Sequence, residues 1–217
     1  MILLHDYWRS SSAYRVRIGL ELLGMAYESR PVDLLAGEQR EAEFLGRNPQ
    51  GLVPVLEIDG LRLTQSLAIL EYLDETRGAG WLPPDAVGRS RVRRLTHAVA
   101  MEVQPVCNLR VVRHVVEASG GAITQEGWMR HVIGLGLAGL ETMLGNGGTG
   151  RFCHEDVVTL ADLCLVPQVY NARRWGVDLG PCPRIVAIEA ALAGLPAVRA
   201  AHPDAVRARH AAGRRTP

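Results

Sequence analysis

Lysine is absent from this chain: every one of its 24 Lys or Arg positions is arginine. Schiff-base aldolases, pyridoxal-phosphate enzymes and phosphate-binding loops ending in Gly-Lys-Ser or Gly-Lys-Thr depend on the lysine amine, so the sequence excludes all three. All-arginine usage is typical of a genome-wide bias. It still shapes the available chemistry, because arginine is permanently charged and binds carboxylates through two parallel hydrogen bonds.

Cysteine is also sparse. The chain has 4 cysteines, which lie far apart and form no C-x-x-C unit: Cys107, Cys153, Cys164 and Cys182. This pattern predicts buried free thiols and signals neither a redox motif nor a zinc site. The 7 histidines are scattered without the spacing of metal ligands, so no metal is expected.

Net charge and hydropathy are both close to zero. A formal charge of +1 and a pI of about 7.8 provide no field that attracts nucleic acid or an anionic membrane, so we expect a small-molecule or protein partner. Residues 1–6 resemble no secretory leader, and no uninterrupted apolar run reaches the roughly 18 residues of a membrane span. The sequence is typical of a cytoplasmic globular protein with one or two cores.

Two kinds of architecture follow one another along the chain. The first 80 residues alternate strand-like and helix-like segments, whereas almost everything after residue 88 has helical patterns. Asp59-Gly60 is a pair favoured in two-residue hairpin turns. The segments expected in the first part follow the order βαβ-ββα: strand 2–4, helix 14–23, strand 26–32, strands 55–58 and 61–63, and helix 66–77.

A proline-rich segment, Trp81-Leu82-Pro83-Pro84-Asp85, interrupts these patterns, and we place the domain boundary there. The sequence thus predicts an α/β domain followed by an all-α domain. The expected division is 1–80 for the α/β domain, 81–87 for the linker, 88–203 for the helical domain and 204–217 for a solvated, arginine-rich tail.

Inside the helical part, one long helix is expected over residues 88–117, kinked by Pro105 beside Gln104 and Asn108. The glycine-rich run 145–150 is interpreted as a connection between helices. Thr159-Leu160-Ala161-Asp162 has the form of a reciprocal helix cap, which predicts the start of a buried helix.

Three short stretches of the α/β part favour ligand binding. Arg9-Ser10-Ser11-Ser12 falls at a predicted helix N-terminus, where partial positive charge stabilises an anion, although a serine cluster there also fits a simple cap. Gln65-Ser66 opens the next helix in the same way. Val53-Pro54 enters a strand, where proline is either an edge feature or a cis bond that exposes the Val53 backbone.

These stretches are found together in one known family. Residues 7–18, 48–54, 65–73 and 165–173 resemble, in order, motifs of the zeta class of glutathione transferases, and the resemblance extends from residue 1 to about 203. It implies a thioredoxin-like N-terminal domain and an all-helical glutathione-transferase C-terminal domain, glutathione as cofactor, and a homodimer.

The resemblance also implies roles for individual residues. Ser10, with Ser11 beside it, would hydrogen-bond the glutathione sulfur, and the Val53 backbone before a cis Pro54 would pair with its cysteinyl part. The other implied contacts are Gln65 and Ser66 to the γ-glutamyl group, Gln39 to the peptide, Gln104 and Asn108 to the ligand, and Arg174 to an acidic substrate. The four-residue spacing of Gln104 and Asn108 predicts that both lie on one helix face. Members of the family often have cysteine where this chain has Ser12, so any role of a protein thiol is absent.

The implied reaction is glutathione-dependent cis–trans isomerisation of maleylacetoacetate by reversible thiolate addition to its double bond. Such a substrate is a small dicarboxylate or keto acid, for which Arg174 and Arg9 are the first candidates. Arg110 is a further candidate, although Arg110, Arg113 and His114 also fit a solvated helix face. The alternatives are maleylpyruvate isomerisation, conjugation or dehalogenation of small α-haloacids, and a non-catalytic binding module.

Overall fold

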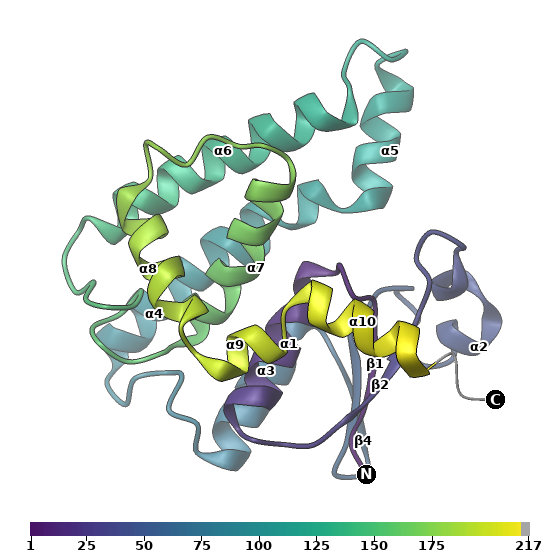
Figure 1. Cartoon of the computed structure of the whole chain (residues 1–217), viewed down its shortest axis with the longest axis horizontal. Coiled ribbons are helices and arrows are strands. Elements are labelled where there is room, and N and C mark those ends of the chain that lie inside the picture. The colour runs from purple at the N-terminus through teal and green to yellow at the C-terminus, as the bar shows by residue number, and fades with distance from the viewer. Residues whose placement is uncertain (214–217) are drawn as a thin grey trace. The chain divides into compact units, whose positions relative to one another are not determined.

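The computed structural model describes residues 1–213 of the chain (Figure 1). Contacts divide them into two compact units, which are described separately below. The first unit combines Met1–Ala79 with the segment from Ala193 onward, and the second is Gly80–Leu192.

The first unit is built on a four-stranded sheet with the strand order β2-β1-β3-β4. β1 (Leu3–Asp6) pairs in parallel with β2 (Glu28–Pro31) and antiparallel with β3 (Val55–Ile58), which pairs antiparallel with β4 (Leu61–Thr64). Asp59 and Gly60 have φ angles of 54° and 76°, the left-handed geometry of a two-residue hairpin. The predicted hairpin is therefore confirmed.

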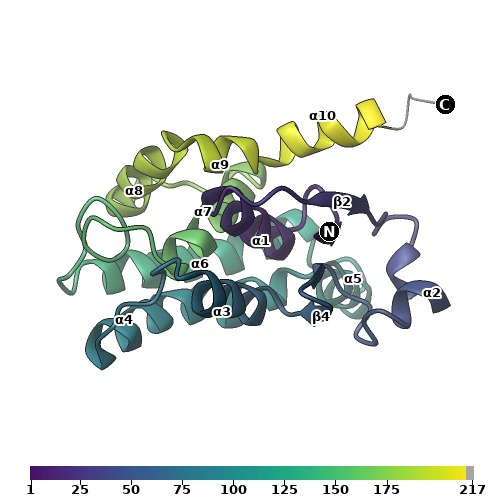
Figure 2. The same ribbon diagram turned by 90° about the horizontal axis from the view of Figure 1, so that it is seen from below.

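Two helices of the first unit pack side by side, as Figures 1 and 2 both show. α1 (Ser11–Leu22) begins three residues before the predicted Tyr14, and all of its residues from Ala13 to Leu20 are buried. α3 (Ser66–Arg77) has the predicted bounds. Two short pieces, a 3-10 turn over Glu38–Arg40 and α2 (Ala42–Leu45), lie between β2 and β3.

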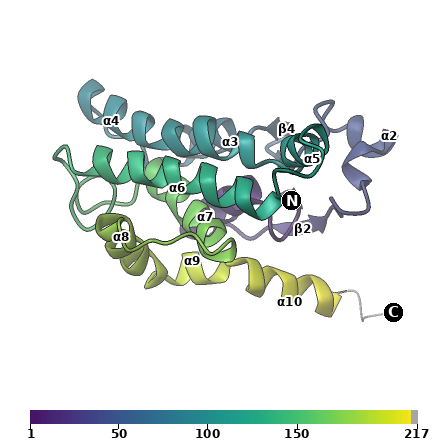
Figure 3. The same cartoon turned by 90° about the horizontal axis from the view of Figure 1, so that it is seen from above.

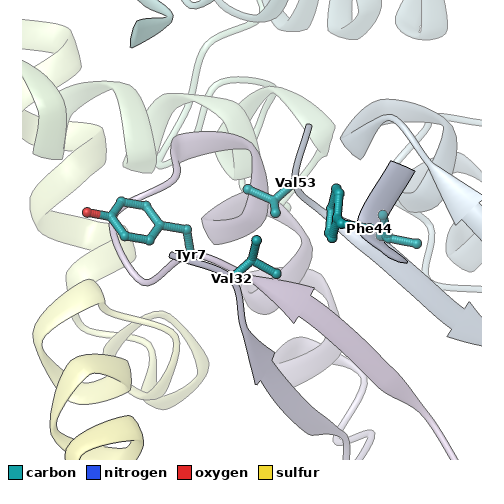
Figure 4. Packing of buried hydrophobic residues seen from close by; sticks show 5 residues of the cluster. Tyr7, Val32, Phe44 and Val53 are labelled. Carbon is teal, nitrogen blue, oxygen red and sulfur yellow. The ribbon is translucent and has the colours of Figure 1, made fainter. Parts of the chain in front are cut away.

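A small apolar cluster connects the strand ends with the segment before β3 (Figure 4). Its members are Tyr7, Val32, Phe44, Val53 and Val55. In Figure 4 the hydroxyl of Tyr7 is directed away from the other labelled side chains. Because Val53 packs in this cluster, the backbone just before Pro54 is held against the end of the sheet.

The C-terminal segment differs from the sequence-based expectation. Residues 204–217 were predicted to form a solvated tail, but α10 spans Pro203–Gly213 and buries Val206; residues 214–217 lie outside the described part. α9 (Pro196–Ala200) packs on α1, and the Tyr14 hydroxyl donates to the Val198 carbonyl at 3.5 Å. Apolar positions in this alanine-rich segment are too sparse to have marked a packed helix.

The second unit is helical. α4 (Ala86–His97), α6 (Gln125–Leu144) and α7 (Leu160–Arg174) pack against one another, and Figure 3 shows α4 running beside α6. α5 (Leu109–Ala118) packs on α6, and α8 (Pro183–Ala193) ends at the edge of the unit.

The prediction of a single kinked helix over residues 88–117 is wrong. After α4 the chain forms a π-helical stretch over Ala98–Val103 and a 3-10 turn over Pro105–Cys107, and Asn108 is extended with ψ 141°. Pro105 lacks the amide that would continue the helix. The Asn108 side chain then accepts a hydrogen bond from the Arg110 amide and starts α5. The chain therefore breaks rather than kinks.

The predicted reciprocal cap is confirmed at the start of α7. Asp162 accepts hydrogen bonds from the Thr159 amide and hydroxyl, both at 2.8 Å, and from the Cys153 amide at 2.9 Å. Burial raises the pKa of the Asp162 carboxyl, and these hydrogen bonds oppose that rise. The cap thus connects the preceding loop to the most buried helix of the second unit.

The four cysteines are free and buried, as predicted. Burial raises the pKa of the Cys107 thiol to about 11 and that of Cys153 well above its usual value. Within residues 1–213, no helix is long and apolar enough to cross a membrane, and no group of His, Cys, Asp or Glu side chains could hold a metal ion.

We predict that Asp162→Ala lowers the free energy of unfolding by about 3 kcal/mol, because two buried amides lose their acceptor. Asp85 caps α4 through the Gly88 amide at an exposed position, so Asp85→Ala is the matched control and costs less. Urea unfolding of both variants measures the difference. Equal losses of unfolding free energy in the two variants contradict a larger contribution of the buried cap at Asp162.

Candidate functional site

The turn between β1 and α1 places Ser10 as the N-cap of α1. The Ser10 amide donates to the Tyr7 carbonyl at 2.8 Å, and its Oγ accepts from the Ala13 amide at 3.2 Å. A hydroxyl that accepts one hydrogen bond still has its own proton to donate. Ser10 therefore caps the helix and also offers a donor beside the first amides of α1, so the two interpretations of the serine cluster are compatible.

A buried ion pair holds this turn in place. Arg17 Nη1 donates to both carboxylate oxygens of Asp6, at 2.7 and 2.8 Å, and neither side chain is exposed. The same guanidinium donates to the Trp8 carbonyl and the Ala201 carbonyl, both at 3.0 Å. Because Trp8 lies two residues before Ser10, the position of the Ser10 hydroxyl depends on Arg17.

The Val53–Pro54 peptide bond is cis, as the resemblance implied. Asn48 folds the loop before it: its side-chain amide donates to the Leu52 carbonyl at 2.8 Å, and its Oδ1 accepts from the Gln50 amide at 3.1 Å. In the described part of the chain, the amide and carbonyl of Val53 have no hydrogen-bond partner. They form a donor and acceptor pair available to an extended peptide.

The start of α3 has an unusual backbone. Gln65, its N-cap, has φ 67° and ψ 111°, and its side chain does not cap the helix but donates to Gln50 Oε1 at 2.7 Å. The first amides of α3 therefore lack a side-chain acceptor at the N-cap, and they are oriented to bind an anion. The buried Ser66 hydroxyl accepts a hydrogen bond from Arg15 Nη1 at 3.2 Å.

Gln39 lies in the 3-10 turn before α2, and its Oε1 is buried without a hydrogen-bond partner in the described chain. A buried amide oxygen without a donor is costly, so this atom is an acceptor site for a ligand N–H. Its backbone lies against Gly51, where an added Cβ would be 3.0 Å from the Gln39 carbonyl oxygen. Gly51, at φ +62°, thus permits the close approach of the two loops.

Arg9 lies over the aromatic side chains next to it, 5.0 Å from the Trp8 ring centre and 5.9 Å from that of Tyr7. The three side chains line a cavity of about 380 Å³ in the first unit. Arg207 of α10 lines the same cavity and lies 5.1 Å from the Trp8 ring centre. The cavity wall thus carries the guanidinium groups of Arg9 and Arg207 and the carboxylates of Asp6 and Asp33, of which Asp6 is already paired with Arg17. The two guanidinium groups can bind an acidic group of a ligand.

The remaining predicted site residues are in the second unit. Gln104 ends the π-helical stretch, whereas Asn108 is extended, so the expectation that they share one helix face is wrong. Arg110 is exposed in the first turn of α5, next to exposed Arg113 and His114. Arg174 is exposed at the end of α7, 4.4 Å from the Trp175 ring centre.

Among the predicted residues, the first unit contains Arg9, Ser10, Ser11, Gln39, Val53, Pro54, Gln65 and Ser66. Together they provide two helix N-termini, a backbone donor and acceptor pair, and a buried amide acceptor. These groups suit a short peptide with a carboxylate at one helix start and a second anion at the other. Sequence reasoning missed Arg15 and Gln50, whose contacts with Ser66 and Gln65 depend on the folded loops.

Comparisons with known proteins point to one family. A family model described as "Glutathione S-transferase, N-terminal domain" matches residues 2–75. The maleylacetoacetate isomerase of Rhizobium meliloti (strain 1021) is 61% identical over 203 residues, covering 93% of this chain and 95% of that protein.

Solved structures agree as well. The maleylacetoacetate isomerase of Anaeromyxobacter dehalogenans 2CP-1 with GSH in its active site has a TM-score of 0.85 and 50% identity, covering 94% of this chain and 96% of that one. The same protein was solved with dicarboxyethyl glutathione and citrate (TM-score 0.84, 50% identity, 94% and 95% covered). The holo structure of a bacterial zeta-class maleylpyruvate isomerase has a TM-score of 0.89 and 39% identity, covering 94% and 97%.

The fold and the site define a glutathione transferase, and the chain belongs to that family. Within the family it belongs with the zeta-class maleylacetoacetate and maleylpyruvate isomerases.

We predict that Gln65→Gly is more stable than Gln65→Ala by about 1 kcal/mol, because only glycine adopts a positive φ without a Cβ penalty. Both variants lose the hydrogen bond to Gln50, so their difference isolates the backbone. Thermal unfolding of the pair is the measurement. A Gln65→Ala variant as stable as Gln65→Gly contradicts the positive φ at this position.

Proposed function

We propose that the chain is a glutathione-dependent cis–trans isomerase that converts maleylacetoacetate to fumarylacetoacetate. The observation that carries this proposal is Ser10 at the start of α1, with a hydroxyl proton to donate beside free helix amides. The 61% identity to a maleylacetoacetate isomerase supports the choice of substrate.

The groups of the first unit fit glutathione. The partnerless amide and carbonyl of Val53 suit its cysteinyl part, the open start of α3 at Gln65 and Ser66 suits the γ-glutamyl carboxylate, and the buried Gln39 oxygen suits a peptide N–H. We include Gln104, Asn108 and Arg110 of the second unit as further contacts to the cofactor.

Glutathione, when bound, supplies the thiolate that adds to the double bond and leaves it again after rotation. A free thiol has a pKa near 8.5, and lowering it by about two units takes roughly 2.7 kcal/mol. The start of α1 contributes about 0.3–2 kcal/mol, and a hydroxyl hydrogen bond to an anion about 1.5–3 kcal/mol. Ser10 and the α1 amides, with Ser11 beside them, therefore suffice without a lysine or a metal.

Arginines bind the acidic acceptor. Arg9 and Arg207 line the cavity of the first unit, with Trp8 between their guanidinium contacts, and we include Arg174 of α7 as a third. Their fixed charges orient the substrate carboxylates and stabilise the enolate charge that develops on addition. The same wall also carries apolar side chains, among them Trp8, Val32 and Leu35, so the two arginines and not an absence of apolar surface support an acidic acceptor.

The proposal also includes a homodimer, as the resemblance to the zeta class implies, and a cytoplasmic location, as expected from the sequence. Size-exclusion chromatography with light scattering measures the assembly directly.

The decisive experiment measures turnover of maleylacetoacetate, maleylpyruvate and a small α-haloacid, each with and without glutathione. We expect isomerisation of maleylacetoacetate that requires glutathione and does not consume it. Faster turnover of maleylpyruvate than of maleylacetoacetate identifies maleylpyruvate as the substrate instead. Stoichiometric loss of glutathione with the haloacid alone identifies a conjugating or dehalogenating transferase, and no turnover of any of them sinks the catalytic proposal.

Ser10→Ala is expected to raise the pKa of the bound glutathione thiol by about 1–2 units, since one hydrogen bond to the anion is lost. The rate at neutral pH then falls, and the pH–rate profile shifts to higher pH. Ser12→Ala is the control, because the Ser12 hydroxyl makes no hydrogen bond among the described residues. An unchanged profile in Ser10→Ala removes Ser10 from the mechanism.

A further inference from the structure

Arg15 is a buried cation with almost no compensation. The residue is 2% exposed and lies in α1, between apolar neighbours that are themselves buried. Its only hydrogen bond is the one from Nη1 to Ser66 Oγ at 3.2 Å. Its Nε and Nη2 atoms are buried without an acceptor, and no carboxylate pairs with it among the described side chains.

Arg17, two residues along the same helix, shows what a fully compensated arginine looks like in this protein. It pairs with Asp6 and donates to the Trp8 and Ala201 carbonyls. A buried charge without such partners is destabilising, because desolvation is not repaid. Arg15 therefore contributes little to the stability of the fold, and its position beside Ser66 needs another reason.

That position is the start of α3. Ser66 is the first residue of this 12-residue helix, whose N-cap provides no side-chain acceptor. By donating to Ser66 Oγ, Arg15 occupies a lone pair of that oxygen and leaves the hydroxyl proton to point elsewhere. The guanidinium also adds a full positive charge, in a low-dielectric setting, to the partial charge of the helix start.

We propose that Arg15 is a positioning residue for the γ-glutamyl carboxylate of glutathione, acting through Ser66 and through its buried charge. The inference rests on the proposed function and deepens it. The Nε and Nη2 atoms of Arg15 are buried, so the ligand does not touch them, and the Ser66 hydroxyl and the α3 amides make the contact. Burial of the Arg15 charge lowers the stability of the fold, and higher affinity for the γ-glutamyl carboxylate offsets that loss.

The test compares Arg15→Met with the wild-type protein by calorimetric binding of two ligands. One is glutathione, and the other is an analogue that lacks the α-carboxylate of the γ-glutamyl residue. We expect Arg15→Met to bind glutathione about tenfold or more weakly and to bind the analogue as the wild type does. Arg15→Lys keeps the charge but not the fork, so it restores part of the lost affinity.

Two further measurements separate positioning from a structural role. The unliganded Arg15→Met protein is expected to melt at or above the wild-type temperature, because an apolar side chain replaces an uncompensated charge. In the isomerase assay, KM for glutathione rises while kcat at saturating glutathione is unchanged. Tyr14→Phe removes a buried hydroxyl of the same helix, and it controls for loosening of α1 without changing either affinity.

A double-mutant cycle with Ser66→Ala tests the route. If Arg15 acts through Ser66, the losses of glutathione affinity in the two single variants are less than additive in the double variant. Full additivity overturns that route. Unchanged glutathione affinity in Arg15→Met, or a parallel loss for both ligands together with a lower melting temperature, overturns the proposal. A wild-type protein that binds neither ligand overturns the proposed function as well.

Discussion

The site of the first unit depends on the guanidinium of Arg17. It binds both oxygens of Asp6 at the end of β1 and the Trp8 carbonyl in the following turn. Buried ion pairs contribute to a fold only when further hydrogen bonds satisfy both groups, and here every nitrogen of the guanidinium has an acceptor. Removing either partner would leave an uncompensated charge inside the unit. This arrangement holds the turn that leads to Ser10, whose Oγ then accepts a hydrogen bond from the Ala13 amide.

The two buried arginines of α1 differ in how fully their guanidinium groups are hydrogen-bonded. Arg17 is satisfied by the protein itself, whereas Arg15 has one hydrogen bond to Ser66 and two buried nitrogens without an acceptor. The first arrangement stabilises the structure. The second leaves unfavourable free energy beside the start of α3, which fits the binding role that we propose for Arg15. Two arginines that lie two residues apart in one helix therefore differ: Arg17 stabilises the fold, and we propose that Arg15 serves ligand binding.

Much of the first unit could be predicted from the sequence because its signals are local. Residues within one turn of each other determine the Asp59-Gly60 hairpin, the bounds of α3 and the Ser10 cap. The cis Val53–Pro54 bond was instead predicted from the family resemblance. The break at Asn108 escaped prediction, because hydrophobic periodicity reports which residues face the core and not whether the backbone continues as a helix. Arg15 escaped because a buried charge is recognisable only once its surroundings are known.

The C-terminal segment has a consequence for how the protein is made. Arg17 is held partly by the hydrogen bond that its Nε donates to the carbonyl of Ala201, which lies 184 residues further along the chain. During synthesis β1 and α1 leave the ribosome first, yet the first unit is complete only after α9 has followed the whole helical unit out of the exit tunnel. A nascent chain truncated before Ala193 therefore carries an unfinished thioredoxin-like unit. The unit whose synthesis begins first is the last to be completed.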